Sequence, residues 1–117
     1  MKIKNLDDIS FKEKIINYEN GPDALYEIKK NSLIEFYSIT CSHCHAMWST
    51  VETAAEDFPD VDFYKVEVNE NPELAALFNI SGTPTFIFIP LKGSPKMAVG
   101  EMPLHEFSEL IRETFKK

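Results

Sequence analysis

Hydrophobic residues recur with two different spacings along the chain, and these spacings predict its helices and strands. Between residues 44 and 58 they fall three or four positions apart, which is typical of a helix with one buried face. The positions of this stripe are Cys44, Met47, Trp48, Val51, Ala54, Ala55 and Phe58. A second stripe predicts a helix near the end of the chain, at Leu104, Phe107, Leu110, Ile111 and Phe115. We expect every member of the first stripe, the tryptophan included, to pack in the core.

Runs of aromatic and β-branched residues predict the strands. The runs at 33–37 and 85–89 are almost wholly apolar, which is typical of strands buried on both faces. The run at 61–68 alternates in part, as a strand with one buried face does. A loop containing glycine separates the run at 85–89 from 96–99, which is a candidate edge strand.

The order of these elements predicts the fold class. Short amphipathic stretches at 9–18 and 25–28 precede the first strand, and another at 72–78 predicts a short helix. The order is helix, strand, helix, strand, helix, strand, strand, helix. It predicts an α/β three-layer sandwich, with a central mixed sheet of four to five strands flanked by helices on both faces. The length of 117 residues suits a single domain spanning 1–117.

The net charge of the chain argues against two classes of binding partner. The chain has 12 Lys and Arg residues against 19 Asp and Glu residues, a formal net charge of −7. Nucleic acids and anionic membranes bind clustered positive charge, so neither is an expected partner. No apolar run approaches the ~18 residues of a membrane-spanning helix. The first eight residues lack the apolar core of a signal peptide, so we expect a cytoplasmic location.

The chain contains two cysteines, Cys41 and Cys44, where a predicted strand meets a predicted helix. A disulfide that closes so short a loop adds little stability, which favours redox chemistry, a metal or haem over a structural role. The partial positive charge of a helix N-terminus favours the nucleophilic thiolate at Cys41. Cys44 lies about one turn further on, along the apolar face, and is the candidate resolving thiol. A charged His43 between them would stabilise the thiolate further.

Two other chemistries fit the same segment. Cys-x-x-Cys-His is the attachment pattern of c-type haem, with His45 as one axial ligand and Met97 or Met102 as the other. The segment also holds four potential ligands for Zn²⁺ or Cu⁺, which are Cys41, His43, Cys44 and His45. Neighbouring side chains of a helix point apart, so one short segment does not easily surround a metal ion. A metal-binding or adaptor protein is nevertheless an alternative to an enzyme.

Several motifs occur together in the order found in one family. The strand at 33–37 leads into Cys-x-x-Cys and a helix, Gly-Thr-Pro-Thr at 82–85 precedes the last strand pair, and Gly100 ends that pair. From about residue 11 to residue 115 the chain resembles the thioredoxin family. The resemblance implies the thioredoxin-like sandwich and an enzyme that exchanges thiols and disulfides with proteins. Cys-x-x-Cys alone is a weak indication, but the proline loop and the order of elements make it specific.

The resemblance implies catalytic roles for three residues and a supporting role for a fourth. Cys41 corresponds to the nucleophile and Cys44 to the resolving cysteine. Glu35 corresponds to the buried acid of the family, which moves a proton to or from the resolving cysteine. Lys65 corresponds to the lysine beside that acid and supports it as an ion partner. His43, because of its position between the two cysteines, is a further candidate catalytic residue that tunes the thiolate.

The resemblance also implies a substrate site. Pro84 corresponds to the cis-proline that packs beside the disulfide, and a cis peptide bond is readily accommodated only before proline. Thr83 would pair its backbone with an extended substrate strand. Ser42 and Gly100 complete the predicted substrate-binding residues. The partners implied are proteins with disulfides or thiols and a reductase or oxidase that recycles the pair, with no cofactor and a monomeric chain.

Departures from the family pattern predict a shift in redox properties. Ser42 and His43 replace the usual Gly-Pro, Thr40 replaces a tryptophan, His45 replaces a lysine, and Thr83 replaces a bulky aliphatic residue. Histidine before the second cysteine is similar to disulfide isomerases and oxidants. We therefore expect a more oxidising couple than that of an ordinary thioredoxin. His105 and the acidic residues Glu67, Glu70 and Glu73 are expected to be solvated.

Overall fold

A computed structural model describes residues 3–21 and 24–116, and its centre is a five-stranded mixed sheet. The strands are β1 (Ile3–Asn5), β2 (Asn31–Tyr37), β3 (Val61–Glu67), β4 (Thr85–Ile89) and β5 (Lys96–Val99). Their order in the sheet is β1-β3-β2-β4-β5. The first three of these are parallel, while β4 and β5 each run antiparallel to the preceding neighbour. The predicted mixed sheet is confirmed.

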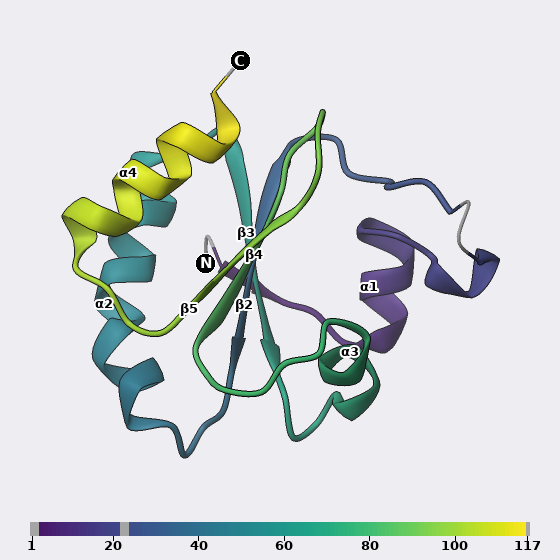
Figure 1. Ribbon diagram of the computed structural model, residues 1–117, viewed down its shortest axis with the longest axis horizontal. Helices are drawn as coiled ribbons and strands as arrows, with labels where there is room; N and C mark the ends of the chain where they lie inside the picture. The colour runs from purple at the N-terminus through teal and green to yellow at the C-terminus, as the bar shows by residue number, and fades with distance from the viewer. Residues whose placement is uncertain (1–2, 22–23, 117) are drawn as a thin grey trace.

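Helices cover both faces of this sheet, which gives the predicted three layers (Figure 1). One face carries α2 (Ser42–Asp57) and α4 (Leu104–Phe115). The other carries α1 (Asp8–Lys14) and α3 (Pro72–Leu77), with a short 3₁₀ turn, η1 (Tyr18–Asn20). No described helix combines the length and the apolar character needed to cross a membrane.

The alternation of side chains along the strands divides the core into two clusters. Leu33 of β2 packs with Phe63 and Phe86 beneath α2 and α4. Ile34 and Phe36, the alternate positions of the same strand, pack beneath α1 and α3. Each fully buried side chain of this size contributes about 1.5–3 kcal/mol relative to an exposed one. Because β2 and β3 are parallel, their carboxyl ends meet at one edge of a well-packed sheet. The segment Cys41-Ser42-His43-Cys44, called the redox motif below, lies at this edge.

The N-terminal region differs from the sequence-based expectation. A short strand, β1, precedes the first helix, and it pairs in parallel with β3 through the register Ile3 to Phe63. Helix α1 then begins after Asp7, whose side chain accepts the Ser10 N–H at 2.8 Å in a capping box. Strand β1 has three residues, which are too few to show a periodicity, so the hydrophobic pattern did not reveal it.

The stretch at 25–28 is not a helix. Leu25 is 80% exposed, and Tyr26 forms an isolated antiparallel bridge with Ile16. The Glu27 N–H donates to the carbonyl of Ile15 at 2.7 Å. Backbone hydrogen bonds therefore hold this segment, in place of a buried hydrophobic face.

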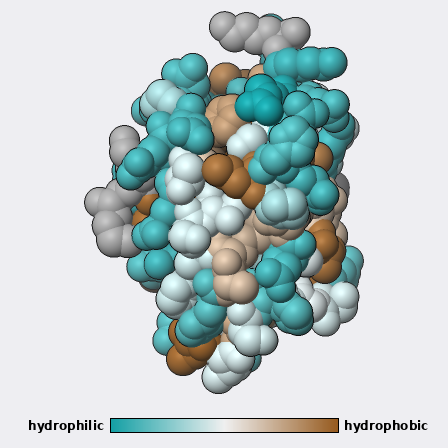
Figure 2. Space-filling view, turned by 90° about the vertical axis from the view of Figure 1, so that its left-hand side faces the viewer, coloured by the Kyte–Doolittle hydropathy of each residue, from teal (hydrophilic) through white to brown (hydrophobic). Residues whose placement is uncertain are grey.

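The outer surface of α2 and α4 is mixed in character. Figure 2 looks onto this side of the molecule and shows hydrophobic side chains separated by hydrophilic ones. The buried members of α2 are Cys44, Met47, Val51, Ala54 and Ala55. The helix therefore turns its apolar stripe toward the sheet and its polar face outward, as the sequence pattern predicts.

Candidate active site

Cys41 is the N-cap residue of α2, directly after the loop that follows β2. Its Sγ accepts the backbone N–H of Cys44 at 3.2 Å and lies 3.4 Å from the carbonyl oxygen of Thr83. The residue is partly exposed, and both cysteines are free thiols. The sulfur thus stands where the unpaired N–H groups of the first helical turn are directed.

The surroundings of Cys41 favour its thiolate. Burial of the sulfur acts to raise the pKa of Cys41, but its contacts with the Cys44 thiol and the Thr83 side chain act against it. The backbone N–H groups of Cys44 and His43 act in the same direction as these contacts. The pKa of Cys41 is therefore below its ordinary value. The contact with the Cys44 thiol is the largest of these lowering effects on the pKa, and the N–H donors at the helix N-terminus add to it.

Cys44 has the opposite environment one turn further along α2. It is fully buried in the apolar stripe. Burial, followed by the contact with the Cys41 thiol, raises the pKa of Cys44 to about 11. At neutral pH this sulfur is a protonated thiol. The two cysteines, three positions apart, therefore differ in both accessibility and charge.

A second loop faces Cys41 from the opposite side. The peptide bond between Thr83 and Pro84 is cis. The Gly100 N–H donates to the carbonyl oxygen of Pro84 at 2.8 Å, which joins this loop to the end of β5. Gly100 has a φ of 98°, a conformation that favours glycine. The structure thus brings Thr83, Pro84 and Gly100 to the redox motif, and Ser42 lies exposed at the start of α2.

Glu35 lies in the middle of β2 and is 2% exposed. It lines a cavity of about 230 Å³ together with Lys65, Trp48 and Val51. Its Oε2 atom is buried and has no hydrogen-bond partner among the residues that the structure describes. Burial raises the pKa of Glu35 to about 7, against the opposing effect of the Lys65 charge, and the charge of Cys41 adds to the increase.

Lys65 lies opposite Glu35 in the register of β2 and β3. The two side chains form no ion pair within 4 Å in the described part of the chain. The Lys65 Nζ atom instead lies 5.8 Å from the centroid of the Tyr37 ring. Lys65 therefore acts on the acid through its charge and not through a direct contact.

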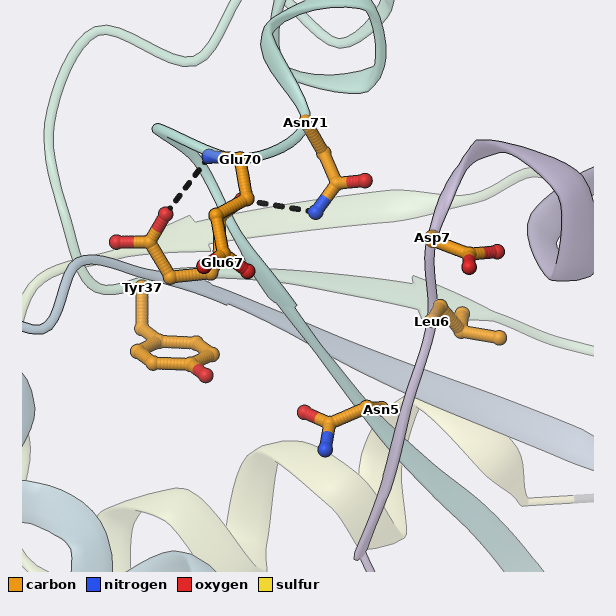
Figure 3. Close-up of a pocket in the computed structure, with 7 residues that line it drawn as sticks. All are labelled: Asn5, Leu6, Asp7, Tyr37, Glu67, Glu70 and Asn71. Atoms are coloured by element: carbon orange, nitrogen blue, oxygen red, sulfur yellow. Dashed lines mark hydrogen bonds between the residues drawn. The ribbon is translucent and has the colours of Figure 1, made fainter.

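Glu67, at the end of β3, is 6% exposed, so the expectation that it is solvated is wrong. Its carboxylate accepts the N–H groups of Ile39 at 3.1 Å, Asn69 at 2.6 Å and Glu70 at 2.9 Å. Figure 3 shows this carboxylate bonded to Glu70, and Asn71 bonded to the Glu67 backbone. Glu67 thereby ties the loop before Cys41 to the loop after β3.

The sequence contains a signal for this role that the solvated interpretation overlooked. Glu67 is the last residue of its strand and is followed by Asn69 and by Asn71-Pro72, a turn whose N–H groups need acceptors. Glu70 and Glu73 of the same acidic group are exposed, as expected, and so is His105.

The two histidines of the motif point to different partners. His43 is 70% exposed, and its Nδ1 atom lies 2.5 Å from Oε1 of Glu101. His45 contacts the Ile39 carbonyl through Nε2 at 2.7 Å and stacks on Trp48 with ring centroids 4.3 Å apart. Hydrogen bonding to Glu101 is the main reason that the pKa of His43 is raised. Glu101 lies 58 positions away, and sequence reasoning did not find it.

Trp48 was expected to pack in the core, and this prediction is wrong. The side chain is 40% exposed and contacts the edge of the Tyr37 ring as well as the face of His45. In the stripe of α2 it lies on the border of the buried face, where an aromatic ring can cover the strand end and still meet solvent. Trp48 therefore lines the same cavity as Glu35 and remains in contact with solvent.

The alternative ligand sets do not come together in this structure. Residues 3–21 and 24–116 contain no group of three or more His, Cys, Asp or Glu side chains placed to hold a metal ion. The proposed axial methionines also have other environments, because Met97 is 50% exposed on β5 and Met102 packs against the core.

Comparison with known proteins agrees with the fold and the motif. The thioredoxin family model matches residues 4–113. Thioredoxin from Borreliella burgdorferi is 26% identical over 112 residues, covering 95% of this chain and 96% of that protein. Thioredoxin from Mycoplasma genitalium is 30% identical over 88 residues, covering 75% of this chain and 86% of that protein.

More distant matches extend the comparison. Protein disulfide-isomerase from Hordeum vulgare is 29% identical over 103 residues, covering 86% of this chain and 20% of that protein. The crystal structure of chloroplastic thioredoxin z superposes with a TM-score of 0.76 at 21% identity, covering 97% of this chain and 94% of that one. The chain therefore belongs to the thioredoxin family of thiol-disulfide oxidoreductases.

Proposed function

We propose that the protein exchanges thiols and disulfides with protein substrates through Cys41 and Cys44. The observation that carries this proposal is the contrast between the two sulfurs within one helical turn. Cys41 is accessible and its pKa is lowered, whereas Cys44 is buried and its pKa is raised to about 11. An attacking sulfur must be exposed and ionised, while a resolving thiol must stay protonated until its target is beside it.

The exchange has two steps. The Cys41 thiolate attacks one sulfur of a substrate disulfide, the substrate S–S bond breaks, and the other substrate sulfur leaves as a thiolate. Cys44 then loses its proton and attacks Sγ of Cys41, which forms the Cys41–Cys44 disulfide and releases the second substrate thiolate. Two electrons pass from the protein to the substrate. The reverse sequence oxidises a substrate dithiol.

Glu35 is the proposed proton acceptor for Cys44. A carboxyl group with a pKa of about 7 is charged in about half of the molecules at neutral pH, so it can accept a proton and return it. The unpartnered Oε2 atom provides a site for that proton, and the effect of the Cys41 charge on the pKa of Glu35 supports its coupling to the two cysteines. Lys65 adjusts the charge of this acid.

The substrate backbone is proposed to align along Thr83. The loop that contains Thr83 and Pro84 lies beside Cys41, with the Thr83 carbonyl oxygen 3.4 Å from the Cys41 sulfur. An extended substrate segment would pair with the Thr83 backbone in the manner of an added strand. Gly100, bonded to Pro84, and the exposed Ser42 are the other proposed substrate-binding residues, and neither carries a large side chain.

The couple is proposed to be more oxidising than that of an ordinary thioredoxin. Contacts that stabilise the thiolate of the reduced form make the disulfide a stronger oxidant. We expect a reduction potential above the thioredoxin value of about −270 mV when the protein is equilibrated with glutathione buffers. A potential at or below that value would contradict the oxidising tendency without affecting the exchange mechanism.

Serine substitutions test the mechanism. Cys41→Ser is expected to abolish reduction of insulin disulfides, because no attacking thiolate remains. Cys44→Ser is expected to retain the first attack and to accumulate mixed disulfides on non-reducing gels, because the release step is lost. Unchanged turnover by Cys41→Ser would remove Cys41 from the mechanism. Absence of trapped species with Cys44→Ser would remove Cys44 from the release step.

A further inference from the structure

A contact between His43 and Glu101 joins the redox motif to the loop after β5. The imidazole Nδ1 atom lies 2.5 Å from the carboxylate Oε1 atom, and the two residues are 58 positions apart in the chain. Both side chains are largely exposed, at 70% and 45%. Whether such an exposed pair is maintained depends on how the backbone holds the two segments.

The backbone supplies that support on both sides. His43 belongs to the first turn of α2, which Cys41 caps. Glu101 follows Gly100, whose N–H is bonded to the carbonyl oxygen of Pro84 at 2.8 Å. The carboxylate is therefore presented from the same loop system that carries the proposed substrate site.

Two ionisable groups act on the His43 imidazole. Glu101 has the larger effect and raises the pKa of His43, first by hydrogen bonding and then by its charge, and the Cys41 thiolate also raises it. His45, the other imidazole of the motif, bonds to the Ile39 carbonyl and stacks on Trp48. The charge state of His43 thus depends on one residue of the motif and one residue outside it.

We propose that Glu101 is a positioning residue for the redox motif: its carboxylate holds the His43 side chain, in the helical turn that Cys41 caps, in the charged form and so sets the pH range in which the Cys41 thiolate is stabilised. This inference rests on the proposed role of Cys41 as the attacking thiol. It assigns Glu101 an effect on the chemistry that is exerted through His43.

The proposal has a characteristic dependence on pH. Without the carboxylate, His43 loses its proton at lower pH than in the wild-type protein. Between the two midpoints the wild-type motif keeps a positive imidazole next to Cys41 and the variant does not, so the variant thiolate is less stabilised there. Below both midpoints the imidazole is charged in both proteins, and the variant also lacks the repulsion between Glu101 and the thiolate.

Glu101→Gln tests this with two independent measurements. NMR titration of His43 is expected to show a lower midpoint, while Glu106→Gln, which removes a charge from an exposed position of α4, leaves it unchanged. The second measurement is the rate of Cys41 alkylation in the variant divided by the rate in the wild type. Between the two His43 midpoints this ratio is expected to fall by about two- to fivefold, the range typical of an exposed ion pair. Below them the ratio returns to one or above.

A double variant separates positioning from a general structural effect. In a His43→Gln background, Glu101→Gln is expected to produce no dip, because the residue through which it acts is gone. A His43 midpoint that does not move, a rate ratio independent of pH, or a dip that persists without His43 would each overturn the proposal. None of these readouts requires turnover of a substrate, so they differ from the insulin assay that tests the exchange mechanism.

Discussion

Two buried glutamates on neighbouring strands near the redox motif have pKa values that are shifted in opposite directions. Glu35 in β2 is 2% exposed and Glu67 at the end of β3 is 6% exposed. Burial raises the pKa of Glu35 to about 7. Burial acts in the same direction on Glu67, but N–H groups of Ile39, Glu70 and Asn69 outweigh it, and the pKa of Glu67 is lowered. Low exposure alone therefore does not determine the charge of an acid: Glu35 lies in the middle of its strand, where no described group donates to its Oε2 atom, whereas Glu67 lies at a strand end where loop N–H groups reach it.

This difference separates the two roles. Oε2 of Glu35 has no hydrogen-bond partner among the described residues, so its proton is readily gained or lost near neutral pH. Both oxygens of Glu67 accept hydrogen bonds from two loops, so this carboxylate remains charged and holds those loops together. Glu35 is suited to carry a proton, and Glu67 is suited to position the backbone that leads to Cys41.

The largest expected effect comes from Glu35→Gln. The pKa of Glu35 is higher in the folded protein than its ordinary value of 4.5, so its contribution to stability is complete below pH 4.5 and is lost as the pH rises through about 7. The step from 4.5 to about 7 corresponds to about 3 kcal/mol. The neutral variant does not lose this energy, so by urea unfolding we expect it to equal the wild type near pH 4 and to exceed it by up to about 3 kcal/mol at pH 8.

The exposed Glu52 provides the matched control, because it borders the same cavity from α2. Glu52→Gln is expected to leave the dependence of stability on pH unchanged. A Glu35→Gln variant whose difference from the wild type is the same at both pH values would show that Glu35 is not a high-pKa acid.

Glu67→Gln is expected to have a smaller effect of the opposite sign. The amide keeps one acceptor but directs N–H groups at the Ile39 N–H, so the variant loses hydrogen bonds to a charged group, which costs about 1.5 kcal/mol at neutral pH. Because the folded-state pKa of Glu67 is lowered, its contribution is present above pH 4.5 and is lost as the pH falls below that value. The two proteins should therefore converge in acid.

Unfolding in urea at pH 7 and near pH 3 measures this convergence. The neighbouring Glu70→Gln serves as the control, since its side chain is exposed and only its backbone bonds to Glu67. A Glu67→Gln variant as stable as the wild type at pH 7 would show that the carboxylate does not hold the two loops.

The sequence predicted the chemistry of one of these glutamates and not that of the other. Glu35 lies within an apolar run, so its burial followed from the pattern and its role from the family resemblance. Glu67 also lies between apolar residues, and its partners are backbone N–H groups of loops. The turn after β3 indicates that such groups need acceptors, but the sequence does not show that Glu67 is the acceptor or that Ile39 is one of the donors. The same limit applies to Glu101, whose contact with His43 depends on how the loop after β5 approaches α2.

Local periodicity explains most of the remaining agreement between the elements predicted from the sequence and those in the structure. The stripe of α2 and the apolar runs of β2 and β4 predicted elements that the structure contains, because long-range packing reinforces those patterns. Trp48 departs from its stripe because it lies at the border of the buried face, beside Tyr37 and His45. Strand β1 and the bridge at Tyr26 depend on backbone pairing with distant segments, which leaves little trace in a short stretch of sequence.

Lys65→Met is expected to give the smallest effect and to show what tunes Glu35. The Lys65 charge opposes the increase in the pKa of Glu35, so its removal should move the Glu35 midpoint further upward, as followed by NMR titration of the carboxyl carbon. The change in stability should remain below about 1 kcal/mol, because the two side chains form no direct ion pair. In a Glu35→Gln background the same substitution should leave the dependence of stability on pH unaltered. A Glu35 midpoint that stays fixed or moves downward would mean that the Lys65 charge does not lower the pKa of this acid.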